Sequence, residues 1–134
     1  MDISADLPAL SDTAVVTVCA GAKSVLDLPA TLEWLETHGV PVLGYGTDVF
    51  PAFYTRSTEP PLPVDARVDT PEDVAAIYKM RARLGFRGRV LVCQTLPADM
   101  ALDTAMVESA TQSALTHAAV RCVYGREVHP VFCA

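Results

Sequence analysis

The sequence is short of basic residues and has no long hydrophobic run. Ten lysine and arginine residues stand against sixteen acidic ones, which gives a formal net charge of −6 at pH 7. So acidic a chain is expected to bind neither nucleic acid nor an anionic membrane surface. It also lacks a run of about eighteen apolar residues, and no basic region precedes an apolar one at the N-terminus. The sequence therefore predicts no membrane span, no secretory signal and a cytoplasmic location.

Closely spaced cysteines are absent as well. Cys19, Cys93, Cys122 and Cys133 never form a C-x-x-C pattern, which argues against a zinc site and against a redox dithiol. We expect reduced thiols, with Cys19 and Cys93 buried as small apolar residues.

What the sequence does contain is typical of one globular α/β domain. It has 134 residues, of which 51% are hydrophobic, and segments of strand character alternate with segments of helix character. Helix starts are predicted where Asp27, Thr70 and Asp103 can serve as caps, the second of them followed by Pro71 and an acid, Asp73. The expected strands are 14–19, 40–45, 66–69 and 89–93, and the expected helices are 28–38, 71–84 and 104–119, with a short turn at 8–12.

Lys23 is the residue that most needs an explanation. It follows an apolar run, 15–18, and the small residues 19–22, an arrangement expected where a buried strand ends beside a ligand or another backbone. The paired glycines of a P-loop are missing, which excludes that nucleotide-binding motif. Three interpretations stay open: a solvated loop residue, a phosphate contact, or an amine that attacks a carbonyl group.

A second strand, 40–45, ends in the same way. Gly44 and Gly46 bring small residues to its end, and the two similar strand ends suggest a common cleft. The aromatic segment 50–57 follows and contains Arg56. That arginine is either solvated on a packed loop or in contact with a phosphate or substrate.

Four blocks of sequence closely resemble the pseudouridine-5′-phosphate glycosidase family, also called the indigoidine synthase A-like family. They occur in the family's order and spacing, and the resemblance covers most of the chain and fades toward the C-terminus. The blocks are Asp2-Ile3-Ser4-Ala5-Asp6-Leu7; Cys19-Ala20-Gly21-Ala22-Lys23-Ser24-Val25-Leu26-Asp27; Leu32-Glu33-Trp34-Leu35-Glu36-Thr37 with Gly39-Val40-Pro41; and Gly44-Tyr45-Gly46-Thr47-Asp48 through Phe50-Pro51-Ala52-Phe53-Tyr54-Thr55-Arg56-Ser57.

The resemblance implies an enzyme that reversibly cleaves the carbon–carbon glycosidic bond of pseudouridine 5′-phosphate to give uracil and ribose 5-phosphate. It places Lys23 on the nucleophile, which forms a Schiff base with C1′ of the sugar. It places Asp2 on a ligand of a divalent metal, usually Mn²⁺, and Ser4, Ala5 and Asp6 on the triplet that contacts the sugar phosphate. The implied fold is a three-layer α/β/α sandwich with a mixed sheet, and the implied assembly is a homotrimer.

The chain also departs from the family. It has less than half the usual length, and the family's proton-donor glutamate and a second substrate-binding lysine belong to a portion that precedes Asp2. Gln94-Thr95 stands in place of an Asn-Pro pair. We therefore expect 1–134 to be a single partial domain, truncated at both ends.

Other functions remain open. The alternative to a glycosidase is a shortened, non-catalytic paralogue or fragment that binds phosphorylated sugar or a full-length partner. A Schiff-base aldolase acting on another phosphorylated sugar would suit the lysine but not the four blocks. The three histidines, His38, His117 and His129, are expected on the surface or in packing.

Overall fold

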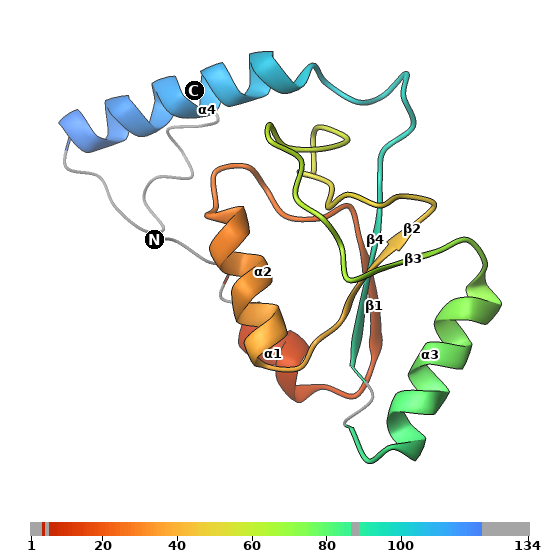
Figure 1. Ribbon diagram of the computed structural model, residues 1–134. Helices are drawn as coiled ribbons and strands as arrows, with labels where there is room; N and C mark the ends of the chain where they lie inside the picture. Colours follow the sequence, from red (N-terminus) through yellow and green to blue (C-terminus); the bar gives the residue numbers. More distant parts are fainter. Residues whose placement is uncertain (1–3, 5, 87–88, 122–134) are drawn as a thin grey trace.

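The computed structural model describes residues 4, 6–86 and 89–121. Helices and strands alternate along the chain, as the sequence predicts, except that β3 follows β2 with no helix between them (Figure 1). In order they are α1 (Leu7–Asp12), β1 (Val16–Cys19), α2 (Leu28–Thr37), β2 (Val42–Tyr45), β3 (Ala66–Val68), α3 (Pro71–Arg83), β4 (Val90–Gln94) and α4 (Thr104–Val120).

The four strands form one sheet in the order β1-β4-β2-β3. All three strand pairings are parallel, with Val16 opposite Val90, Val42 opposite Leu91, and Leu43 opposite Ala66. The expectation of a mixed sheet is therefore wrong for the described strands. After each strand, the chain crosses back to the end of the sheet where that strand began, so the next strand runs in the same direction. Strands connected in this way pair in parallel.

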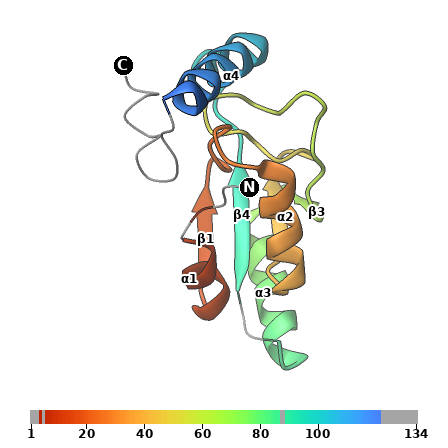
Figure 2. The same cartoon turned by 90° about the vertical axis from the view of Figure 1, so that its left-hand side faces the viewer.

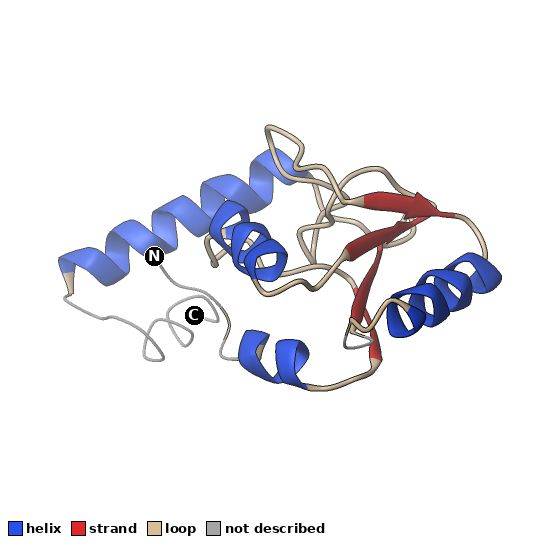
Figure 3. Ribbon diagram, turned by 60° about the horizontal axis from the view of Figure 1, so that its bottom comes forward, coloured by secondary structure: helices blue, strands red, loops and turns tan. Residues whose placement is uncertain are grey.

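Helices cover both faces of the sheet (Figures 2 and 3). On one face, Leu7 of α1 and Leu35 of α2 pack in a cluster with Leu91. On the other face, residues of α3 such as Ile77 pack against Val92. Neighbouring residues of β4 thus point to opposite layers, so the described residues form the expected α/β/α arrangement with an apolar core on each side.

The predicted helix starts are confirmed at atomic detail. The carboxylates of Asp27 and Asp103 accept hydrogen bonds from backbone N–H groups in the first turns of α2 and α4, at 3.0 Å and 2.9 Å. Thr70 and Asp73 form a reciprocal capping box at the start of α3. Local sequence signals therefore fix where three of the helices begin.

β1 lies at an edge of the sheet and is only partly covered. Val16 is 38% exposed and Val18 is 66% exposed, both on the α3 side. α4 is also mostly exposed and lies across the carboxyl end of the sheet rather than on a face (Figure 1). Within the described part of the chain, no helix has the length and apolar character needed to cross a membrane.

Candidate active site

The chain turns sharply at Gly21, just after β1. Gly21 has a φ of +85°, and a Cβ atom there would overlap the carbonyl oxygen of Pro51. A bridge between Gly21 and Ala52 holds the two segments side by side. The lack of a side chain at Gly21 lets the segment after β2 cross the carboxyl end of β1. This is the close backbone approach that the small residues predict.

Lys23 lies in the turn that follows, beside the aromatic segment. Its Nζ atom is 5.7 Å from the centre of the Phe53 ring, which is within the range of a cation–π contact. The position of that ring is fixed from the backbone, because the N–H of Phe53 donates to the carbonyl oxygen of Ala20 at 3.1 Å. Tyr54 packs edge-on against Phe53, with ring centres 4.9 Å apart. Lys23 is half-buried and therefore lies at the border of an aromatic surface.

The aromatic segment connects the ends of several elements. The carbonyl oxygen of Tyr54 accepts a hydrogen bond from the N–H of Leu102, just before α4, at 2.8 Å. The Arg56 guanidinium donates to the carbonyl oxygen of Leu96, after β4, at 2.8 Å. The two glycine-containing strand ends thus meet through this segment, although β4 separates β1 from β2 within the sheet. Arg56 holds the loop in place, and its side chain stays exposed.

A groove of about 550 Å³ lies between the Lys23 turn and α4. Ser24 lines it from the turn, and the Oγ of Ser24 is 3.5 Å from the Oγ1 of Thr111 on α4. On the same helix, a carboxylate oxygen of Glu108 accepts from the N–H of Glu59 at 3.1 Å. The helix side of the groove is lined by the polar Glu108, Ser109, Thr111 and Gln112 together with Ala105 and Leu115. Lys23 does not line the groove itself; its neighbour Ser24 does, so the groove begins one residue beyond the lysine.

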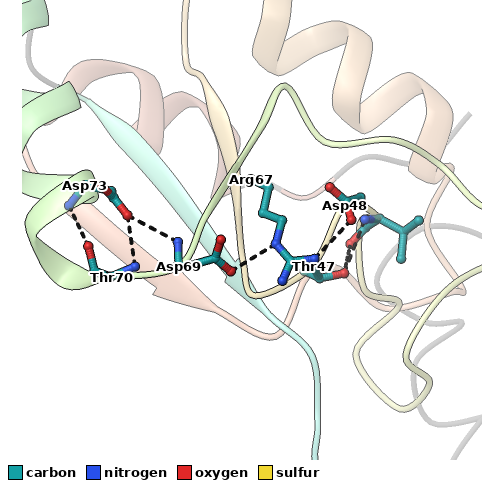
Figure 4. Close-up of polar contacts among 7 residues, drawn as sticks. Thr47, Asp48, Arg67, Asp69, Thr70 and Asp73 are labelled. Carbon is teal, nitrogen blue, oxygen red and sulfur yellow. Dashed lines mark hydrogen bonds and ion pairs between the residues drawn. The ribbon is translucent and has the colours of Figure 1, made fainter.

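Acidic residues beyond the carboxyl ends of β2 and β3 form ion pairs with one arginine (Figure 4). Arg67 donates to Asp69 at 2.9 Å and to Asp48 at 3.1 Å. The hydrogen bond with Asp69, and to a smaller extent the one with Asp48, raises the pKa of the Arg67 guanidinium. Because both ion pairs are exposed, they contribute little to stability, and they serve mainly to orient the loop.

The predicted phosphate triplet is described only in part. The hydroxyl of Ser4 donates to the carboxylate of Asp6 at 3.2 Å and accepts from the N–H of Asp6, also at 3.2 Å. The two residues precede α1, whereas Lys23 follows β1. Ala5 and the predicted metal ligand Asp2 lie outside the described residues. The substrate-binding and metal-binding roles of these four residues stay predictions.

Metal ligands do not gather anywhere in the described part of the chain. No group of three or more histidine, cysteine, aspartate or glutamate side chains there could hold a metal ion. His38 stacks on Trp34 with ring centres 3.6 Å apart and donates to that residue's carbonyl oxygen at 2.7 Å. His38 is thus an exposed residue stacked on its own helix, and His117 is exposed too, as expected of surface or packing residues; His129 lies outside the described residues.

One pair of reactive side chains is missed by reading the sequence alone. Cys19 and Cys93 are far apart in the chain, but they are directly opposite each other on β1 and β4, with Sγ atoms 3.6 Å apart. The search for a C-x-x-C pattern cannot find such a pair, because the parallel register creates it. The available signal was that both cysteines fall at the end of a predicted strand.

The parallel sheet, its helices on both faces and the lysine at its carboxyl edge define an α/β protein with a candidate site for a carbonyl-bearing ligand. Comparison with known protein families identifies the family to which this α/β protein belongs. The sequence model of the family described as "Indigoidine synthase A like protein" matches residues 1–134, and the chain belongs to this family.

Curated relatives of this chain are named pseudouridine-5′-phosphate glycosidases. The protein of Symbiobacterium thermophilum is 51% identical over 133 residues, which is 99% of this chain and 42% of the relative. The protein of Caldanaerobacter subterraneus subsp. tengcongensis is 48% identical over 129 residues, which is 96% of this chain and 41% of the relative. The chain therefore spans well under half the length of these relatives.

Solved structures of similar proteins share the fold. The prealnumycin C-glycosynthase AlnA, solved in complex with ribulose 5-phosphate, matches with a TM-score of 0.88 at 36% identity, over 98% of this chain and 43% of AlnA. An indigoidine synthase A-like protein of Thermotoga maritima matches with a TM-score of 0.78 at 29% identity, over 98% of this chain and 42% of that protein. The described α/β unit thus corresponds to part of the larger structures.

Proposed function

We propose that this chain supplies the lysine nucleophile of a pseudouridine-5′-phosphate glycosidase. The reaction is the reversible cleavage of the carbon–carbon glycosidic bond to give uracil and ribose 5-phosphate. The observation that carries the proposal is the placement of Lys23 just after β1, at the carboxyl edge of the sheet and against the Phe53 ring, with its neighbour Ser24 lining the groove against α4. The names of the relatives support the substrate, and the ribulose 5-phosphate bound to AlnA supports a sugar-phosphate ligand.

The chemistry explains why a lysine is needed. An ordinary glycosidase protonates a leaving oxygen and stabilises the sugar cation with a second carboxylate. The carbon of a pyrimidine ring has no lone pair to protonate in that way. Attack of the Lys23 amine on C1′ displaces the ring oxygen, which takes up a proton, and leaves C1′ bonded to both the nitrogen and the pyrimidine carbon. When the carbon–carbon bond breaks, the nitrogen lone pair forms a C=N bond to C1′, and water later hydrolyses this iminium ion to release ribose 5-phosphate and the free lysine. An acid must protonate the pyrimidine carbon as the carbon–carbon bond breaks.

The described surroundings of Lys23 suit the first of these steps. The Phe53 ring and the neighbouring Tyr54 present an apolar, aromatic border on one side of the amine. The neighbouring Ser24 and residues of α4 such as Glu108 and Gln112 line a groove whose polar groups could bind the hydroxyls of a sugar. An aromatic border limits water around the amine, and polar groups orient the ligand, which is how binding places reacting atoms close together.

The remaining parts of the proposal rest on the family resemblance. Ser4, Ala5 and Asp6 would contact the sugar phosphate, and a divalent metal, for which Mn²⁺ is the candidate, would be bound by Asp2. Asp2 lies outside the described residues, and the described ones contain no cluster of metal ligands. The 134 residues would form one partial domain of an enzyme that assembles as a homotrimer.

A non-catalytic fragment or paralogue is the second candidate. It would bind phosphorylated sugar or a full-length partner without turnover, and the chain spans 41–42% of the glycosidases quoted above. Incubation of the purified chain with pseudouridine 5′-phosphate separates the two. Release of uracil above the rate of a Lys23→Ala control shows catalysis by this chain. No release from a folded sample assigns catalysis to residues elsewhere in a longer protein.

The Schiff base itself is tested by reductive trapping. The chain is incubated with ribose 5-phosphate and cyanoborohydride, and the intact mass is measured. We expect one sugar phosphate added, because reduction converts the reversible imine into a stable amine.

The sequence offers a matched control for this experiment. Lys23 and Lys79 are its only two lysines, and Lys79 lies on the exposed surface of α3. The adduct should be lost in Lys23→Ala and kept in Lys79→Ala. Equal labelling of the two variants would contradict the proposed nucleophile.

A further inference from the structure

Two thiols face each other at the base of the Lys23 turn. Cys19 is the last residue of β1, and Cys93 is opposite it in the register of β4, so both side chains project from the same face of the sheet. Their Sγ atoms are 3.6 Å apart, in hydrogen-bonding contact. Both are free thiols in the structure. This pair plays no part in the reaction proposed above.

The two thiols differ in exposure. Cys93 is fully buried in the cluster between the sheet and the helices α1 and α2. Cys19 is only partly buried, because β1 is the edge strand of the sheet. A small oxidant can therefore reach Cys19 more readily than Cys93.

The contact between the thiols also makes them chemically unequal. The hydrogen bond with Cys93 lowers the pKa of Cys19 to about 7, with a backbone contribution from Gly21, although burial acts in the opposite direction. The same hydrogen bond and the burial of Cys93 raise the pKa of Cys93. At neutral pH, Cys19 is therefore the thiolate that reacts first, and Cys93 is the neighbouring thiol.

The strand spacing permits a covalent link between them. Neighbouring strands lie about 4.8 Å apart, within the range of about 4.4–6.8 Å seen between the Cα atoms of disulfide-bonded residues. The Cβ atoms of a disulfide are usually about 3.5–4.5 Å apart, a little less than the strand spacing. Bond formation must pull the two strand ends together, so the bond should be reduced easily by small thiols.

We infer that Cys19 and Cys93 form an oxidation site that reacts with peroxides to give a reversible disulfide between β1 and β4. The Cys19 thiolate attacks one peroxide oxygen, the oxygen–oxygen bond breaks, and hydroxide leaves, so that Cys19 becomes a sulfenic acid. The sulfur of Cys93 then attacks the sulfur of Cys19, and the sulfenic hydroxyl leaves as water with the Cys93 proton. In total, two thiols and one hydrogen peroxide give one disulfide and two waters.

The experiment uses hydrogen peroxide on the 134-residue chain carrying Cys122→Ser and Cys133→Ser, so that Cys19 and Cys93 are the only thiols. Circular dichroism before treatment checks that the chain is folded. Intact mass should fall by two hydrogens and return after treatment with dithiothreitol. Trypsin without reductant should then give one linked species that joins the peptides of residues 1–23 and 90–121.

A Cys93→Ala change in the same background tests the order of the steps. Without its partner, Cys19 should stop at the sulfenic acid, and its labelling by dimedone should rise several-fold. The unmodified four-cysteine chain, mapped in the same way, keeps the test valid if this variant fails to fold. Two results would overturn the inference: both thiols still alkylated after peroxide treatment of a folded chain, or over-oxidation of Cys19 with no linked peptide.

Discussion

Replacement of Gly21 by alanine tests whether the strand-end turn depends on a missing side chain. Two effects act at this position. The backbone has a φ of +85°, where a residue with a Cβ costs about 1–2 kcal/mol relative to glycine. The added methyl group would also overlap the carbonyl oxygen of Pro51, which belongs to the backbone and cannot rotate away. Overpacking of this kind costs about 1–3 kcal/mol more.

Gly39→Ala is the matched control. Gly39 also has a positive φ, of +67°, but a Cβ atom there would meet nothing within 4 Å. Both changes restrict the unfolded chain to the same extent, so that contribution cancels when the two variants are compared. Gly21→Ala should therefore lower the free energy of unfolding by about 1–3 kcal/mol more than Gly39→Ala.

The assay is urea unfolding of the chain and both variants, followed by circular dichroism, with the slopes compared to check that the unfolding transitions are alike. Equal losses of stability in the two variants would refute the reasoning, because only the overlap with Pro51 distinguishes them. A difference of the predicted size would show that the aromatic segment is held tightly against the end of β1.

Two further predictions concern the framework around the site. Leu35 on α2 is fully buried, so Leu35→Ala should lower the free energy of unfolding in urea by about 2–5 kcal/mol. Leu84 is 67% exposed, so the control Leu84→Ala should change that free energy by no more than about 0.5 kcal/mol. Similar losses in the two variants would contradict the assigned core. Hydrogen bonds with Thr70 and the backbone of Asp69 lower the pKa of Asp73 from its ordinary 3.8. The ionised carboxylate therefore stabilises the folded state above that pH and ceases to do so as the pH falls through the lowered value. Asp73→Asn should lower the free energy of unfolding near neutral pH, and the difference from the unchanged chain should shrink below about pH 4 when urea unfolding is repeated across this pH range. A difference in free energy that does not depend on pH would argue against this role.

The helices were largely predictable because their signals are local. Each helix cap is a hydrogen bond between a side chain and the backbone N–H three residues further on, so a short stretch of sequence contains both partners. The three capping residues are Asp27, Thr70 and Asp103. The strand ends at Gly21 and Gly44 were predictable for a similar reason, since small residues after an apolar run indicate a close approach. The nature of the approaching group, the Pro51 backbone, was not.

The features that the sequence did not predict arise from long-range pairing. The parallel register brings Cys19 to Cys93, and no local pattern records that contact. The mixed sheet was expected from the family resemblance, whereas the described strands are all parallel. The contact between Lys23 and Phe53 likewise depends on how the segment after β2 crosses β1. The functional roles of Asp2, Ser4, Ala5 and Asp6 stay predictions.

The central claim is that Lys23 is the amine that bonds to the sugar, and locating the trapped adduct tests it most directly. After reduction in the presence of ribose 5-phosphate, the chain is digested and each peptide is sequenced by mass spectrometry. The added mass should lie on Lys23. A sugar on Lys79 or on the terminal amine, with Lys23 unmodified in a folded sample, would contradict the account.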